Sequence, residues 1–295
     1  MVNIVKRKRG RNIYYYLQHK IRKDNIQREI YLGTKIPDNI EEIEQSFLLE
    51  FYRKQWIPTL EHIYESYTNR IKKIPKSVFE KEIQNFAINF TYNTDRIEGS
   101  TLTLHETAAL LEYNISPANR PLGDVKEAEN HQKLFLQIIK EKKDLSLVTI
   151  LGWHNRLFFQ TKPDISGNIR NYNVNIARSK FIPPKAEAVK ILLNKFFRWY
   201  DSNKTRINPV ELAALVHLKF VSIHPFGDGN GRISRLMMNF ILNKYGYPML
   251  DIRYNDRRSY YTALEKAQTK QNDIYFLQWF MRRYFKIHKE HTKTK

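Results

Sequence analysis

The sequence predicts a mainly α-helical protein with two small β elements. Over most of the chain, apolar residues recur at spacings of three and four, which is the period of an amphipathic helix. Two short segments instead combine aromatic and branched residues with turn residues, as β-strands do. Of the 295 residues, 42% are apolar, which is enough material for a folded core. We therefore expect one helical domain with two β attachments.

The first β element is expected near the N-terminus. Residues 12–18 and 27–32 are rich in aromatic and branched side chains, and a charged stretch around Lys23 separates them. This pattern predicts a β-hairpin within residues 1–37. Asp38 then offers an N-cap for the acidic helical stretch that follows.

Nine helices are expected in the rest of the chain, each with apolar residues at helical spacing. They cover residues 41–70, 79–92, 103–112, 124–140, 146–160, 185–201, 209–223, 231–245 and 257–287. One interruption, residues 167–184, has short alternation, Asn-rich turn material and terminal prolines, and it predicts a second small hairpin. The expected organisation is a basic hairpin segment at 1–37, a helical domain at 38–288 and a basic tail at 289–295.

The composition excludes several classes of protein. The chain has no cysteine, so disulfides, thiolate metal sites and cysteine nucleophiles are ruled out. No apolar run approaches the roughly 20 residues that span a bilayer. The basic N-terminal stretch lacks the apolar core and cleavage site of a secretory signal. We therefore expect a soluble, cytoplasmic protein without a membrane partner.

The net charge of +20 raises the question of nucleic-acid binding, because Lys and Arg release counterions from phosphates. Most basic residues are spread over the chain, as on many solvated surfaces. Residues 1–36 are the concentrated part, with ten basic residues against Asp24 and Glu29, interleaved with tyrosines. No helix-turn-helix or RRM signature is present, and the same pattern suits a strand pair that packs on a helical body. Both interpretations stay open.

The segment that carries the chemistry is residues 224–235, which read His-Pro-Phe-Gly-Asp-Gly-Asn-Gly-Arg-Ile-Ser-Arg between two apolar helices. Inside a helix, each of its three glycines would cost about 1 kcal/mol relative to Ala. In a loop, they let consecutive N–H groups converge at the start of the next helix, where the helix dipole also favours an anion. Arg232 and Arg235 lie one turn apart on that helix and can both reach such an anion. A polyphosphate fits this combination best.

Two further residues of the segment suggest catalysis. Asp228 supplies the carboxylate that a Mg²⁺ ion bridging two phosphates would require. His224 is an imidazole that can accept a proton from an incoming hydroxyl near neutral pH. Each feature alone is explained by a packing histidine or a glycine-rich turn, but together they indicate phosphate chemistry. The spacing does not fit a Walker loop, a His-Glu-x-x-His pair or a Ca²⁺ loop.

At every fixed position, residues 224–235 match the signature His-x-Phe-x-Asp/Glu-Gly-Asn-Gly-Arg-x-x-Arg, so the segment resembles the Fic family. Residues 167–184, with Arg170 and Val174, resemble the family's flap hairpin, and residues 259–268 resemble its adenine-side helix. The resemblance covers roughly residues 80–285. It implies a Fic-fold helical bundle that uses Mg²⁺ and ATP to transfer AMP to a Ser, Thr or Tyr hydroxyl of a protein target. The chain itself is one candidate target.

The resemblance also implies a role for each matching residue. His224 would deprotonate the target hydroxyl, Asp228 would hold Mg²⁺, and Phe226 would anchor the loop in the core. The nucleotide site would further include Gly227, Gly229, Asn230, Gly231, Arg232 and Arg235 around the phosphates, and Tyr261, Leu264 and Gln268 beside the base. The flap residues Asn173, Val174 and Asn175 would hold the target segment by strand-like pairing.

Upstream of this segment, Thr94-Asp-Arg-Ile-Glu98-Gly99 matches the family's inhibitory motif Ser/Thr-x-x-x-Glu-Gly/Asn. The resemblance implies that Glu98 pairs with Arg235 and inhibits the enzyme. An ordinary helix end, with Gly99 just beyond it, would explain the motif by itself. The other histidines are expected to pack or to lie on the surface. They are His105, His131, His154 and His217.

The resemblance leaves other activities open. Fic-fold relatives also transfer UMP, phosphocholine or phosphate, or remove AMP with the help of the inhibitory glutamate. Nucleic-acid binding through the basic N-terminal segment is the alternative from a different class of function. The identity of the protein target stays open, as does the choice between a monomer and a homo-oligomer.

Overall fold

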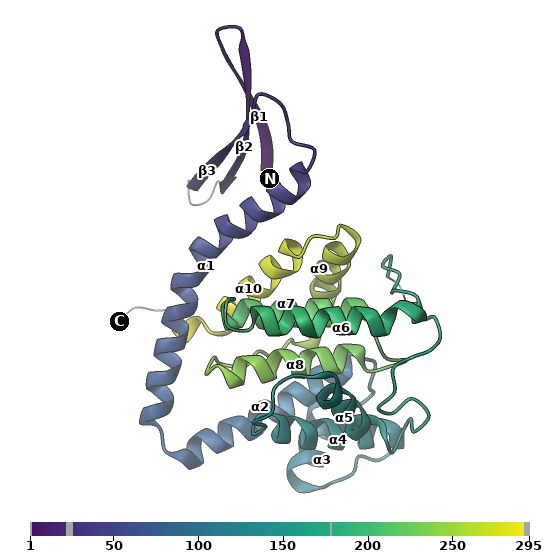
Figure 1. The fold of residues 1–295 in the computed structure, drawn as a ribbon. Coiled ribbons are helices and arrows are strands. Elements are labelled where there is room, and N and C mark those ends of the chain that lie inside the picture. Colours follow the sequence, from purple (N-terminus) through teal and green to yellow (C-terminus); the bar gives the residue numbers. More distant parts are fainter. Residues whose placement is uncertain (1, 22–25, 178, 292–295) are drawn as a thin grey trace. The chain divides into compact units, whose positions relative to one another are not determined.

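The computed structural model describes residues 2–21, 26–177 and 179–291. These residues form ten α-helices and one three-stranded antiparallel sheet, so the mainly α fold class is confirmed (Figure 1). They divide into two compact units, Met1–Glu61 and His62–Lys295. None of the described helices is long and apolar enough to cross a membrane.

The first unit contains the sheet. Its strands β1 (Val2–Arg9), β2 (Asn12–Ile21) and β3 (Ile26–Gly33) pair antiparallel in the order β1-β2-β3. The predicted hairpin of β2 and β3 is confirmed, but β1 was not predicted. Its four consecutive basic residues hide the alternation of a strand, and pairing with β2 decides its structure instead. The predicted hairpin is therefore the second half of a three-stranded sheet.

One face of this sheet packs on the first half of α1 (Ile40–Lys73). Leu17 and His19, two residues apart on β2 and hence on the same face, are 1% and 5% exposed. The His19 ring meets the Phe51 ring edge-on at 4.7 Å, and its Nε2 lies 3.2 Å from the Tyr52 hydroxyl. This contact gives the first unit a small core of its own.

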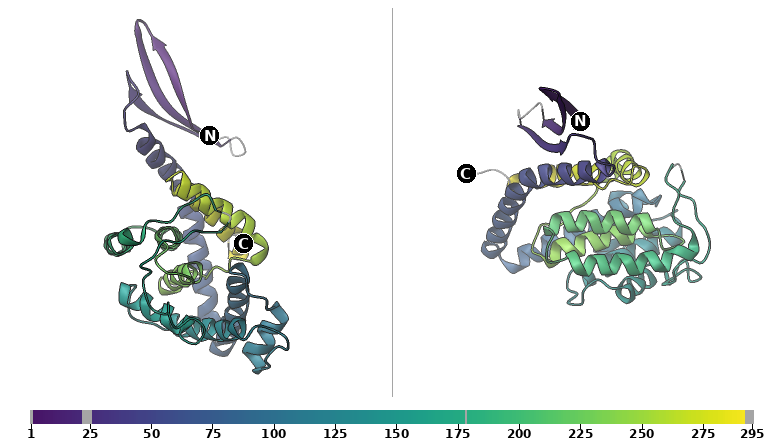
Figure 2. Two further views of the ribbon diagram at one scale, coloured as in Figure 1. Left: turned by 90° about the vertical axis from the view of Figure 1, so that its right-hand side faces the viewer. Right: turned by 45° about the horizontal axis from the view of Figure 1, so that its top comes forward.

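The second unit is helical. After α1 it contains α2 (Lys76–Ile97), α3 (Leu104–Tyr113), α4 (Leu122–Ile138), α5 (Leu147–Phe158), α6 (Ala186–Asn203), α7 (Pro209–Ile223), α8 (Asn230–Lys244), α9 (Arg257–Thr269) and α10 (Ile274–Ile287), with single 3₁₀ turns at Tyr254–Asp256 and Lys289–His291. The central pair is α7 and α8, which run side by side (Figures 1 and 2). Helices α2, α4 and α5 contact α8, while α6 and α10 contact α7. The loop between α7 and α8 therefore starts from the most buried part of the unit.

The helix predicted over residues 257–287 is two helices, α9 and α10. The chain breaks at Gln271, whose φ of 47° is incompatible with a continuing right-handed helix. The Asn272 N–H donates back to the Ala267 carbonyl at 3.0 Å, and the Asn272 side-chain oxygen accepts from the Ile274 N–H at 3.0 Å. The left-handed residue and the backbone bond to Ala267 thus end α9, and the Asn272 side chain caps the start of α10.

The prediction of a second hairpin over residues 167–184 is wrong. Apart from position 178, which lies outside the described residues, the segment contains no strand. Arg170 donates to the carbonyls of Tyr172 and Pro184, at 2.9 and 2.6 Å, and the Asn173 side-chain oxygen accepts from the Ala186 N–H at 3.0 Å. Side chains rather than a strand ladder bond this backbone, so we call residues 167–184 the flap loop.

Candidate active site

His224 stands at the junction of α7 and the loop, in the left-handed region with φ 52° and ψ 58°. Arg170 of the flap loop holds this junction. Its Nε donates to the His224 carbonyl at 2.7 Å, and its backbone N–H donates to the Pro225 carbonyl at 2.9 Å. The left-handed backbone, which is costly for a residue other than Gly, is therefore supported from the flap side.

The His224 ring is set up as a proton acceptor. Its Nδ1 lies 3.3 Å from the Val221 carbonyl, which can only accept, so Nδ1 carries the hydrogen and Nε2 is the acceptor in the neutral ring. Burial lowers the pKa of His224, and the nearby Arg170 charge acts in the same direction, against the bond to Val221. The ring is therefore neutral at pH 7, which is the form a general base needs.

The middle of the loop is held from within and from α5. Phe226 is 1% exposed and stacks on the His154 ring at 3.8 Å. Asn230 bonds both backbone groups of Phe226, each at 2.9 Å. His154 accepts from the Gly167 N–H at 2.9 Å through Nδ1 and reaches the Asp228 carbonyl at 3.1 Å through Nε2. Asn230 is expected at the phosphates, but its side chain instead holds the backbone of the loop in place.

Each of the three loop glycines lies against another group. A Cβ at Gly227 would overlap the Tyr172 hydroxyl, and one at Gly229, whose φ is 79°, would overlap the Phe158 ring. A Cβ at Gly231 would overlap the Glu98 carboxylate. The glycines are thus needed for close approach, and the last of them admits Glu98 to the first turn of α8.

Asp228 is held by cations. Its Oδ2 accepts from Lys162 Nζ at 2.6 Å and lies 3.4 Å from the Arg232 guanidinium, while its Oδ1 accepts from the Gly229 N–H at 2.5 Å. Burial would raise the pKa of Asp228, but the charges of Arg232 and Lys162 outweigh it and keep the pKa below its usual value. Lys162 also pairs with Glu127 at 2.9 Å. Asp228 is thus an ionised carboxylate whose charge an ammonium group already neutralises.

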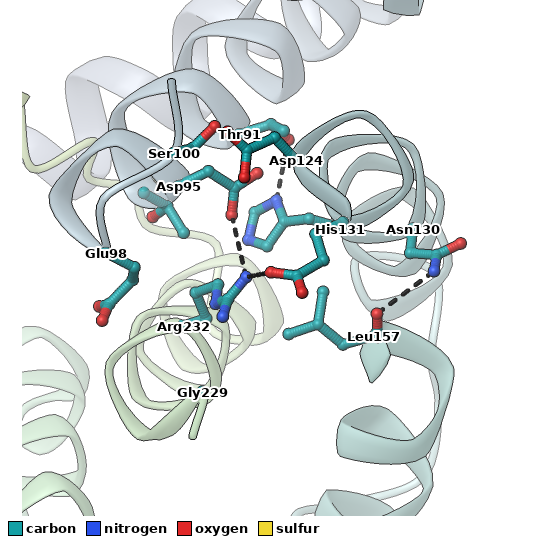
Figure 3. Close-up of polar contacts among 12 residues, drawn as sticks. Thr91, Asp95, Glu98, Ser100, Asp124, Asn130, His131, Leu157, Gly229 and Arg232 are labelled. Carbon is teal, nitrogen blue, oxygen red and sulfur yellow. Dashed lines mark hydrogen bonds and ion pairs between the residues drawn. The ribbon is translucent and has the colours of Figure 1, made fainter. Parts of the chain in front are cut away.

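Arg232 is 3% exposed and lies among acidic side chains. It donates to Glu127 of α4, and its guanidinium lies 3.7 Å from the Asp95 carboxylate of α2 (Figure 3). Burial raises the pKa of Asp95 to about 7, with Arg232 opposing the shift. The resemblance places Arg232 at the phosphates, whereas in the structure it links α8 to α2 and α4.

Arg235 is 1% exposed and is bonded mainly by α2. Its Nε donates to the Thr94 hydroxyl at 3.0 Å, and another of its nitrogens donates to Glu98 Oε1 at 2.5 Å. Arg235 also donates to the Thr94 carbonyl and to the Tyr260 hydroxyl, each at 3.3 Å. Thr94 and Glu98 are four residues apart, so both face the same guanidinium from one side of α2. This geometry explains why the motif needs a hydroxyl and a carboxylate at that spacing.

Glu98 lies at the end of α2. Helix α2 stops at Ile97, Gly99 follows with φ 104°, and the Ser100 N–H bonds back to the Asp95 carbonyl at 3.0 Å. The helix-end interpretation of the motif is therefore correct, and it is also what delivers Glu98 to Arg235. The carboxylate lies against Gly231 in the first turn of α8, where amide groups and the helix dipole favour an anion. An internal anion thus occupies the position expected for a phosphate.

A cavity of about 280 Å³ lies beside these residues. Its charged lining consists of Asp95, Glu98, Asp124, Glu127, Asp228, Lys162 and Arg232. Carboxylates outnumber cations in this lining, so a bare polyphosphate would meet repulsion, whereas a phosphate accompanied by a cation would not.

The residues expected at the adenine and at the target occupy neighbouring elements. Tyr261 is 45% exposed and donates to the Ile97 carbonyl at 3.1 Å, Leu264 is buried, and Gln268 donates to the Ser222 hydroxyl at 3.1 Å. Glu265, on the same helix, accepts from the Lys180 N–H of the flap loop at 2.7 Å. The flap residues Val174 and Asn175 are half-buried and exposed, respectively. Helix α9 therefore touches both the inhibitory segment and the flap loop.

Three functional contacts were missed by reasoning from the sequence. Lys162 meets Asp228 across 66 positions, Glu127 meets Arg232 across 105, and His154 meets the Asp228 carbonyl across 74. His154 packs against Phe226, as expected, and it also bonds to the backbone of the loop. Nothing in the local sequence around these residues marks them. Of the other histidines, His131 and His217 are buried and His105 is exposed, as expected.

Comparison with known proteins agrees with this geometry. Residues 144–242 match the Fic/DOC family model. The chain is 33% identical over 193 residues to the protein adenylyltransferase Fic of Nematostella vectensis, covering 64% of the chain and 45% of that protein. It is 34% identical over 180 residues to the protein of the same name in Drosophila melanogaster, covering 60% of the chain and 36% of the relative. The chain thus spans less than half the length of these curated relatives.

Solved structures show the same fold. A Fic-domain signaling protein from Bacteroides thetaiotaomicron superposes with a TM-score of 0.72 at 26% identity, over 80% of this chain and 96% of that one. Fic-1 of C. elegans superposes with a TM-score of 0.69 at 23% identity, over 88% of this chain and 78% of that one. With the signature loop and the family-model match together, residues 144–242 carry a domain of the Fic/DOC family.

Proposed function

We propose that the chain is a protein adenylyltransferase that moves AMP from ATP to a Ser, Thr or Tyr hydroxyl of a protein, and that Glu98 inhibits it. The observation that carries the proposal is the Glu98–Arg235 pair at the start of α8, where an internal carboxylate occupies a built anion site. The names of the relatives from Nematostella and Drosophila support the same activity.

The proposed reaction uses the loop residues as follows. His224 Nε2 takes the proton of the target hydroxyl, whose oxygen forms a bond to the α-phosphorus of ATP. The bond between that phosphorus and the oxygen bridging to the β-phosphate breaks, and pyrophosphate leaves. The N-terminal amides of α8 bind the phosphates, and Arg235, once freed from Glu98, binds the terminal phosphate. Positioning and charge stabilisation carry the reaction, as in other phosphoryl-group transfers.

Mg²⁺ fits the acidic side of the site. Lys162 Nζ stands 2.6 Å from Asp228 and, with the Arg232 guanidinium at 3.4 Å, supplies positive charge beside this carboxylate. Mg²⁺ commonly binds through one or two carboxylates, with phosphate oxygens and water as its other ligands. Asp228 would hold the ion, which would neutralise charge on the phosphates when bound. Lys162 would then keep its second partner, Glu127.

The class of transferred group is decided by intact-mass measurement. We propose incubating Glu98→Gly protein with Mg²⁺ and, separately, with ATP, UTP, GTP or CDP-choline. An added AMP mass with ATP alone is expected. An adduct only with another donor would reassign the reaction within the same fold, and loss of AMP from a previously modified protein, without any gain, would favour the removal activity.

Asp228→Ala is expected to reduce Mg²⁺-dependent AMP transfer by about a hundredfold or more, because the protein ligand for the metal is removed. Binding of ATP in the presence of EDTA should change far less. Asp124→Ala is a matched control, because Asp124 lines the same cavity but bonds to Thr101 instead. Transfer by the Asp228 variant that is as fast as with Asp228 in place, or equal transfer with and without Mg²⁺ by protein that keeps Asp228, would contradict the metal role.

Lys162→Met is expected to tighten binding of a divalent metal by about fivefold or more, since it removes the ammonium that competes for Asp228. The measurement is Mn²⁺ binding by electron paramagnetic resonance in the presence of saturating ADP. Lys126→Met serves as the control, because Lys126 pairs with Glu129 at 3.1 Å and does not contact Asp228. Unchanged or weaker Mn²⁺ binding by the Lys162 variant would show that Lys162 does not stand in for the metal.

A further inference from the structure

The sheet of the first unit has a second face, which α1 does not cover. In an antiparallel sheet, directly paired residues lie on the same face, and neighbours along a strand lie on opposite faces. Arg7 pairs with Tyr14, and Tyr16 pairs with Tyr31. These side chains therefore lie opposite the Leu17 face that packs on α1. We call Arg7, Tyr14, Tyr16 and Tyr31 the tyrosine face.

The aromatic rings of this face form a cluster. The Tyr31 ring lies 5.4 Å from Tyr16 and 6.1 Å from Tyr14, and the Arg7 guanidinium lies 4.5 Å above the Tyr16 ring. Tyr31 is 56% exposed. Tyr14 and Tyr16 are half-buried, so Tyr31 presents the most open ring of the cluster. Tyrosines on a sheet surface, with arginine beside them, form the kind of platform on which bases stack.

Uncompensated positive charge flanks the tyrosines. Arg7 is neutralised by Glu29, which accepts two bonds from it at 2.8 and 2.7 Å. Arg9, which pairs with Asn12 on the same face, and Arg11 in the following turn are exposed. Lys8 is exposed as well, but it pairs with Ile13 and lies on the other face. None of the acidic side chains in the described residues forms an ion pair with Arg9 or Arg11. These two arginines are therefore available to the phosphates of a ligand that stacks on the rings.

The charge of α1 decides which face a polyanion meets. The first turns of α1 carry Glu41, Glu42 and Glu44, and this helix packs on the Leu17 face. These carboxylates repel a phosphate backbone from α1, whereas Arg9 and Arg11 attract it to the β1–β2 turn beside the tyrosine face. An acidic peptide would use the charges but would leave the aromatic platform unused. Charge and stacking together select a nucleic acid with unpaired bases.

We propose that the tyrosine face and the β1–β2 turn bind single-stranded nucleic acid. The inference is independent of the proposed transferase activity, because it uses no residue of the second unit. The test is fluorescence anisotropy of the full chain with a labelled oligonucleotide of about 20 nucleotides and with the duplex of the same sequence. Tighter binding of the single strand is expected.

The basic residues are tested by two variants of equal charge change. Arg9→Gln and Arg11→Gln combined should flatten the dependence of log affinity on log salt by about 1.4, since each lost contact to a single strand removes about 0.7. The control combines Lys142→Gln and Lys143→Gln, which are exposed residues of the second unit. An equal effect of both combinations would overturn the site, because general attraction to a +20 protein would explain it.

The platform is tested by a conservative pair of variants. Tyr31→Ala should weaken binding of the single strand by about fivefold or more, whereas Tyr31→Phe, which keeps the ring, should bind as the original chain does. A duplex that binds more tightly than the single strand, with Tyr31→Ala unchanged, would overturn the stacking role. No measurable binding of either oligonucleotide at about 50 mM salt would overturn the proposal as a whole.

Discussion

His224→Ala is expected to lower AMP transfer by at least about a hundredfold, the usual contribution of a positioned general base. ATP binding should persist, because the α8 amides and Arg235 are untouched. The measurements are the rate of AMP incorporation in the Glu98→Gly background and ATP affinity by calorimetry. His105→Ala is the control, since His105 is exposed on α3. Retained transfer by the His224 variant would remove this residue from the mechanism.

The pH dependence of the same reaction follows from the lowered pKa of His224. A ring whose pKa is lowered by burial stays neutral at pH values where a free histidine begins to charge. Transfer should therefore be flat near pH 7 and decline only below the ordinary pKa of histidine, about 6.5. The unfolded chain takes up the proton before the folded one does, so this group also reduces stability as the pH falls through that range. A transfer rate that already falls with decreasing pH above pH 7 would contradict the lowered pKa of His224.

Glu98→Gly is expected to raise automodification by about tenfold or more. The Glu98–Arg235 bond is 2.5 Å long, and the Arg235 side chain is 1% exposed, so solvent does not screen this partner. Bonds to charged groups contribute about 1.5–3 kcal/mol, which corresponds to about tenfold or more. Freed from Glu98, Arg235 can orient ATP, whereas in the original chain a misplaced α-phosphorus slows attack. The measurement is AMP incorporation at saturating Mg-ATP.

Two further variants separate inhibition from a general loosening of the site. Glu98→Gln keeps the size and a polar bond but loses the charge, so an intermediate rate is expected. Adding Arg235→Ala to Glu98→Gly should remove most of the gain, because the arginine is the group that inhibition withholds. If Glu98→Gly labels no faster than the original chain while its thermal unfolding is unchanged, Glu98 is a helix-terminal residue without an inhibitory role.

The sequence by itself determined the features that depend on local chemistry. Helical spacing located the helices, and the glycine-rich segment 224–235 stood out because its combination of residue types indicates phosphate chemistry. Thr94 and Glu98 were matched to Arg235 by motif, and the three residues are in contact. The spacing of apolar residues predicted one helix over residues 257–287, but the chain turns at Gln271 and Asn272. A hairpin was predicted for the flap loop, but bonds from the Arg170 side chain take the place of strand pairing there.

Only the tertiary structure decided which distant side chains complete the site. Lys162 on Asp228, Glu127 on Arg232 and His154 beneath Phe226 come from helices and turns that meet α8 after folding. Strand β1 was also decided by the tertiary structure, because its pairing with β2, and not its composition, makes it a strand. The physical reason is that the residues next to a charged side chain or a backbone hydrogen-bonding group do not indicate which distant group will be its partner. Burial, which requires each buried polar group to find a partner, selects that partner from anywhere in the chain.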